Sequence, residues 1–145
     1  KYLKNIERQE MENFILAAVT DDGITISQHF GRAKYYEIVF VENKQVIKKE
    51  RREKMGHHNF ANAEHQHHDH NSEHGMDETS HNKHLSMAEV IKDCSILLAR
   101  GMGNGAFQSL SQLNIKTIIT DIKNIDDAVE SVINDTIINH TEKLH

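Results

Sequence analysis

The sequence predicts an α/β fold in which helices flank a mixed sheet of five or six strands. In the first half, strand-length apolar runs follow one another with only short turns between them, as antiparallel strands do. In the second half such runs alternate with segments of helical periodicity, which favours parallel strands joined by right-handed crossovers. A chain of 145 residues also fits one domain with a single core.

The first half contains a strong turn signal between two predicted strands. The run FILAAVT is continuously apolar and has the length of a strand, and Asp21-Asp22-Gly23 follows it. An Asp-Gly pair is a hairpin signal, so ITIS is predicted to be a short returning strand. YYEIVFV is rich in β-branched and aromatic residues, and Glu42-Asn43-Lys44 makes a turn into QVIKKE. The predicted strands of this half are residues 14–20, 24–27, 35–41 and 45–50.

The second half has two helix-start signals. Ser86 with Glu89 three residues later matches a capping box, and apolar residues follow at helical spacing. Asn124 is predicted to cap a later helix whose first turn is acidic, where the helix dipole favours negative charge. Strands are predicted over residues 95–99 and 116–120, and the two later helices over 106–113 and 125–135.

Composition excludes several classes of protein. The formal net charge of −5 argues against a general nucleic-acid binder. The single cysteine, Cys94, rules out an internal disulfide framework and favours a reducing compartment. No stretch approaches the roughly 18 apolar residues of a membrane span. We therefore expect a cytoplasmic protein without a membrane partner, made of an N-terminal extension over residues 1–13 and one domain over 14–145.

A histidine-rich stretch interrupts this domain. Residues 57–84 hold nine of the twelve histidines, mixed with acidic residues, so the stretch is not a purification tag. Because residues of about 54–84 show no periodicity, we expect a flexible loop there. Neutral imidazole suits zinc, nickel, copper and iron, so the loop is predicted to bind an exchangeable transition metal such as Zn, Ni or Fe; the alternative is a solvated linker. The predicted ligands are His57, His58, His65, His67, His68, His70 and His74.

Other candidate binding residues lie at the ends of predicted strands. His29 follows the second predicted strand and is either a metal or cofactor ligand or a structural histidine. Arg32 pairs either with an anionic cofactor or with a surface carboxylate. Cys94 is a small buried apolar residue or a thiolate ligand that would need partners. Glycines in the loop Gly101-Met102-Gly103 either let backbone amides converge on an anion or make a tight turn.

Two of these stretches carry a family resemblance. SQHFGRA at residues 27–33, and GMG at 101–103 followed by GAF at 105–107, resemble the dinitrogenase iron–molybdenum cofactor biosynthesis family of small accessory domains. The resemblance covers residues 14 to about 139 without the histidine loop. It implies a ribonuclease-H-like fold, a metal-cofactor ligand at His29, and the binding or transfer of iron–sulfur-based cofactors during nitrogenase assembly.

Two features depart from the family, and one activity is not predicted. The three-cysteine radical-SAM motif of the larger cofactor-synthesis enzymes is missing from the sequence, and Asn104 stands where the family often has proline. A ribonuclease-H-like fold also suggests a nuclease, but two-metal chemistry needs clustered carboxylates. The strand at residues 14–20 has none, and Glu37 stands alone on its strand.

These observations predict a non-enzymatic carrier of a metal ion or an iron–sulfur cofactor precursor. The alternative is a histidine-rich metal store or sensor that acts through a partner. A carrier needs a protein that donates the cofactor and one that accepts it. Ligands shared with a second subunit would make the chain a homodimer, because one cysteine cannot hold a cluster alone.

Overall fold

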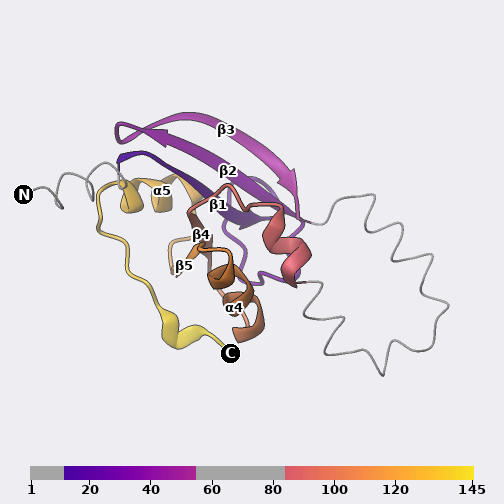
Figure 1. Cartoon of the computed structure of the whole chain (residues 1–145). Coiled ribbons are helices and arrows are strands. Elements are labelled where there is room, and N and C mark those ends of the chain that lie inside the picture. The colour runs from indigo at the N-terminus through magenta and orange to yellow at the C-terminus, as the bar shows by residue number, and fades with distance from the viewer. Residues whose placement is uncertain (1–11, 55–83) are drawn as a thin grey trace, which may run out of the picture.

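The computed structural model describes residues 12–54 and 84–145, and places a mixed five-stranded sheet at the centre of the domain (Figure 1). The strand order is β3-β2-β1-β4-β5. The first three strands pair antiparallel, whereas β1 with β4 and β4 with β5 pair parallel. The strands are β1 Phe14–Thr20, β2 Tyr35–Glu42, β3 Gln45–Glu53, β4 Ile96–Ala99 and β5 Lys116–Ile119. The mixed sheet predicted from the sequence is thus confirmed, with five strands.

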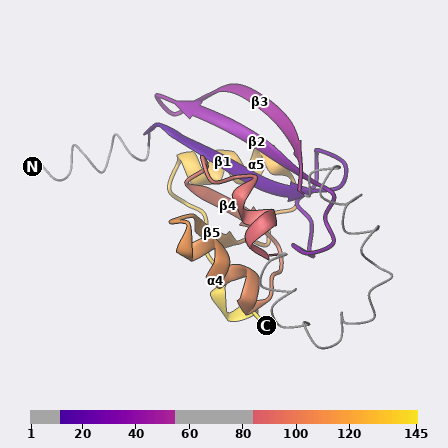
Figure 2. The ribbon, with the colours of Figure 1, turned by 45° about the vertical axis from the view of Figure 1, so that its right-hand side comes forward.

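Helices cover both faces of this sheet (Figures 1 and 2). A helical segment over residues 84–89 lies on the face of β2 that carries Tyr36, whose hydroxyl donates to the carbonyl of Met87 at 2.8 Å. Helix α4, Asn104–Gln112, lies beside this segment, and α5, Ile125–Ile133, covers the opposite face. Between these layers β1 is buried on both sides, as its continuous apolar run predicts. A 3₁₀ turn, η2, spans Thr141–Lys143.

The predicted cap of α5 is confirmed. The Asn124 side chain accepts a hydrogen bond from the backbone N–H of Asp127 at 3.0 Å, and Asp126 and Asp127 occupy the first turn. The turn between β2 and β3 also lies where the sequence predicts it, with positive φ at Asn43 and Lys44. This conformation matches the right-handed twist of a two-stranded hairpin.

The prediction of a returning strand over residues 24–27 is wrong. Only isolated bridges form there, between Thr20 and Ile26 and between Thr25 and Asn124. The Asp22 carboxylate accepts the N–H groups of Ile24 and Thr25 at 2.9 and 2.7 Å, so the chain folds back on its own side chain. The result is a closed loop in place of a hairpin.

The prediction that Ser86 caps a helix is also wrong. Ser86 is exposed and lies inside the helical segment 84–89. The segment ends in a turn in which the N–H of Cys94 donates to the carbonyl of Ile91 at 2.8 Å, just before β4. Among the described residues, no helix is long and apolar enough to cross a membrane.

Candidate functional site

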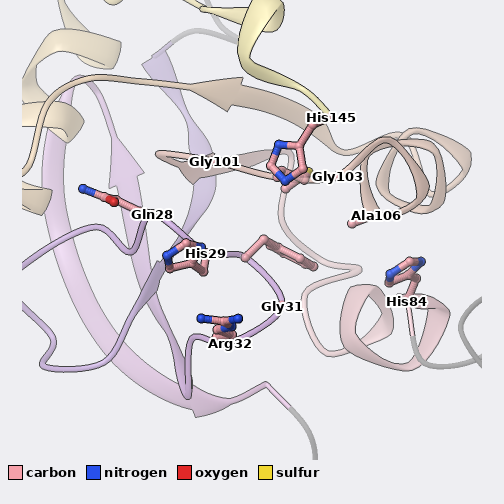
Figure 3. Close-up of a pocket in the computed structure, with 11 residues that line it drawn as sticks. Gln28, His29, Gly31, Arg32, His84, Gly101, Gly103, Ala106 and His145 are labelled. Atoms are coloured by element: carbon pink, nitrogen blue, oxygen red, sulfur yellow. The ribbon is translucent and has the colours of Figure 1, made fainter.

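A pocket of about 310 Å³ opens at the carboxyl ends of β1 and β4 (Figure 3). Ligands of open α/β sheets bind at this end of the strands, because the loops that follow the strands diverge there. The pocket is formed by the loop after β1, the loop after β4, the start of α4, the start of segment 84–89 and the last residues of the chain. The lining residues are Gln28, His29, Phe30, Gly31, Arg32, His84, Gly101, Met102, Gly103, Ala106 and His145.

The loop after β1 packs directly on the loop after β4. The N–H of Phe30 donates to the carbonyl of Gly101 at 3.3 Å, and the N–H of Arg100 donates to the carbonyl of Ser27 at 3.0 Å. A Cβ atom on Gly101 would lie 2.3 Å from the carbonyl oxygen of Gln28, so only glycine permits this approach. Gly101 therefore sets the distance between the two loops and, with it, the width of the pocket.

A tight turn places His29 and Arg32 on the pocket rim. The carbonyl of His29 accepts the N–H groups of Arg32 and Ala33 at 3.2 and 3.0 Å. The N–H of His29 donates to the Ser27 hydroxyl at 3.1 Å, which fixes the start of the turn. Side chains three residues apart in such a turn face the same way, and both His29 and Arg32 are exposed.

Phe30 contributes an apolar ring to the pocket. Phe30 is only 2% exposed, and the buried Lys54 amine lies 4.3 Å from the centroid of its ring. Because a ring face carries negative charge density, this cation–π contact helps to hold the Phe30 ring in place.

Two further imidazoles enter the pocket from distant parts of the chain. His84 lies beside Ala106, and His145 lies beside Gly103 at the start of α4 (Figure 3). Gly103 caps α4 without a side-chain hydrogen bond. The positive end of the helix dipole therefore points at this region.

The pocket combines positive charge and nitrogen donors. None of the described residues that line it has a carboxylate side chain. Three imidazoles, the Arg32 guanidinium and the start of α4 surround the opening. Such a surface favours an anionic ligand, or one whose metal atoms accept nitrogen ligands.

The Cys94 thiol lies outside this pocket. Cys94 precedes β4, whereas the pocket opens where β4 ends. Burial, together with the neighbouring Asp93 carboxylate, raises the pKa of the Cys94 thiol to about 12. The thiol is therefore protonated at neutral pH, and it is a poor metal ligand in this form.

The structure brings together five of the six cofactor-binding residues predicted from the sequence. His29, Arg32, Gly101, Met102 and Gly103 all line the pocket, and Cys94 does not. The seven predicted metal ligands at positions 57–74 lie outside the described residues. Sequence reasoning assigned no role to His145 and treated His84 only as part of the histidine loop. No sequence signal identifies His145, because its place depends on how the C-terminal segment packs.

A comparison with known families identifies the family of the chain. Residues 12–135 match the family described as dinitrogenase iron-molybdenum cofactor. The chain belongs to this family. The resemblance stated from the two glycine-containing motifs is thereby confirmed, and no curated protein matches the chain.

Solved structures of similar fold cover nearly the whole chain. PH0822 is 20% identical, with a TM-score of 0.61 over 88% of this chain and 97% of its own. The apo form of the orange protein from Desulfovibrio gigas is 18% identical, with a TM-score of 0.59 over 92% and 96%. The protein mj0327 from Methanocaldococcus jannaschii is 14% identical, with a TM-score of 0.58 over 89% and 96%. At these identities the likeness shows the fold.

Proposed function

We propose that this member of the family is a non-enzymatic carrier that holds an anionic metal–sulfur cofactor precursor in the pocket at the ends of β1 and β4. The observation that carries the proposal is the convergence of His29, His84 and His145 with Arg32 around one opening that, among the described residues, no Asp or Glu side chain lines. The family description, which names the iron-molybdenum cofactor, supports the same class of cargo.

The size and spacing of the site favour a cargo larger than one ion. The pocket has a volume of about 310 Å³. Within residues 12–54 and 84–145, no three His, Cys, Asp or Glu side chains are grouped closely enough to hold a metal ion. The imidazoles that line the pocket are thus too far apart to bind one metal ion together. A larger cargo with several metal and sulfur atoms would be able to contact more than one of them.

The charges of the site favour an anionic cargo. The Arg32 guanidinium is exposed at the rim of the pocket. Sulfide-bridged metal clusters often carry net negative charge, which Arg32 and the α4 dipole stabilise. Since no thiolate lines the pocket, nitrogen ligands and hydrogen bonds would hold the cargo. Such binding suits transfer, because it leaves metal sites open to the acceptor protein's own ligands.

The test is anaerobic reconstitution of the full chain with iron and sulfide, followed by visible absorption. Wild-type protein should take up a coloured species. His29→Ala and Arg32→Ala should each weaken its binding by about tenfold or more, since even loss of a group that only orients a ligand costs about this much. Cys94→Ala is the matched control because Cys94 lies outside the pocket, and it should bind as wild type does. Absence of a coloured species in wild type, or equal binding by all variants, would reject the proposal.

A second candidate function is metal storage or sensing. The observation that favours it is that His84, the last histidine of the histidine-rich stretch, lines the pocket. Metal bound by that stretch would then be sensed at the pocket. If so, nickel titrated into apo protein should shift the NMR resonances of His84 and Gly101 together with those of residues 57–74. Unchanged Gly101 resonances would reject this coupling.

A further inference from the structure

The C-terminal segment of residues 140–145 reaches the pocket through its last residue, His145, which lines it. The N–H of His145 donates to the carbonyl of Met102 at 3.2 Å, and the N–H of Asn104 donates to the carbonyl of His145 at 3.0 Å. Leu144 pairs with Met102 in a parallel bridge. These contacts join the segment to the end of β4 and the start of α4, and they place the His145 imidazole at the opening (Figure 3).

An ion cluster holds the other end of this segment. The His140 ring lies between two carboxylates, with Nε2 at 3.1 Å from Asp121 and Nδ1 at 2.9 Å from Glu142. The Lys143 ammonium group pairs with the other oxygen of Asp121. Lys143 foremost, and then His140, holds the pKa of the Asp121 carboxyl below its usual range, so that the carboxylate is ionised at neutral pH. Because Asp121 lies two residues beyond the end of β5, the cluster ties the segment to the sheet.

Few apolar contacts fix the segment. None of its residues is fully buried, and of its six residues only Leu144 packs against the hydrophobic core. Segments with few buried apolar contacts open locally at low free-energy cost. The position of this segment then depends on polar contacts. At one end these are the ion cluster and the hydrogen bond that the N–H of His140 donates to the carbonyl of Ile119 at 2.8 Å, and at the other end they are the backbone hydrogen bonds of His145.

We propose that Asp121, His140 and Lys143 are positioning residues of the cargo pocket, which act by holding segment 140–145 so that His145 contacts the cargo. This inference rests on the proposed carrier function. Loss of the cluster frees the segment, withdraws the imidazole and opens one side of the pocket. Cargo is then released faster, although none of the three positioning residues lines the pocket.

The first test needs no cargo. Asp121→Asn keeps the side-chain shape but removes the charge that pairs with Lys143 and His140. The amides of Asn104 and His145 should exchange with solvent about three- to tenfold faster than in wild type, the scale expected for loss of an ion network at the surface. Asp126→Asn is the control, since Asp126 is an exposed carboxylate that pairs with Lys49 of β3, the strand at the other edge of the sheet from β5. Equal exchange in wild type and Asp121→Asn would overturn the role of the cluster.

The second test uses the coloured iron–sulfide species and a ferrous chelator. Asp121→Asn should release iron about three- to tenfold faster than wild type, whereas Asp121→Glu should restore part of the retention. In a His145→Ala background the same substitution should change the rate by less than about twofold, because the two residues act through one contact. An equal effect in both backgrounds, or no effect despite faster amide exchange, would overturn the inference. If wild type forms no coloured species, the proposed function fails and the positioning role fails with it, while amide exchange still decides the role of the cluster.

Discussion

Gly101→Ala is the sharpest test of how the pocket is built. The added Cβ would lie 2.3 Å from the carbonyl oxygen of Gln28, whereas ordinary contact begins at 3.4 Å. The two loops must therefore separate by about 1 Å, against the hydrogen bonds that join Phe30 to Gly101 and Arg100 to Ser27. Overpacking of this kind costs about 1–3 kcal/mol.

Thermal unfolding followed by circular dichroism measures this cost. For a chain of this size, ~1 kcal/mol corresponds to ~2–4 °C in Tm, so Gly101→Ala should lower Tm by about 2–12 °C. Gly31→Ala is the matched control, because a Cβ there meets no atom within 4 Å, and its Tm should change little. Equal Tm values for both variants would mean that the close approach of the loops does not constrain the pocket.

Three further predictions concern ionisation and metal binding. Hydrogen bonds from the backbone of Thr25 and Ile24 lower the pKa of Asp22 to about 2. The resulting stabilisation should be complete above the unfolded value of ~3.9 and lost as pH falls through the folded value; a carboxyl NMR titration with a midpoint near ~3.9 would contradict this. With a pKa of about 12, Cys94 should react with iodoacetamide far more slowly in native than in urea-unfolded protein, and comparable rates would show an accessible thiolate. Nickel or zinc should shift the imidazole resonances of residues 57–74, and unshifted resonances at several equivalents would show that this stretch is not a metal site.

Most of the fold could be predicted because its strands carry local signals. β1 is a continuous apolar run. The turn before β3 and the Asn124 cap form at residues whose own conformational and hydrogen-bonding preferences favour a turn and a helix start. The two errors differ in kind. At residues 24–27 the Asp22 side chain accepts hydrogen bonds from backbone groups that a second strand would have paired, so a local side-chain contact overrides a short sequence signal. At Ser86 the helical segment already includes the residue that was expected to cap it.

The site could be predicted only in part. His29, Arg32 and the loop of residues 101–103 were identified because a family motif and a glycine pattern mark them. Cys94 was a plausible ligand by chemistry alone, since thiolates bind iron–sulfur species. The strand predicted over residues 95–99 already places Cys94 at the end of β4 away from the loop of residues 101–103. The raised pKa of its thiol follows from burial and from Asp93, and burial depends on the tertiary structure.

The sequence alone determined the strand-rich first half, the alternation in the second half and the two motifs that place the chain in its family. These features follow from periodicity and turn chemistry, which act over a few neighbouring residues. Only the tertiary structure decided which groups meet. His29, His84 and His145 come together because the loops after parallel strands open at one edge of the sheet and the C-terminal segment returns to it. Contacts between residues so far apart in the chain depend on packing and register, and these are properties of the whole fold.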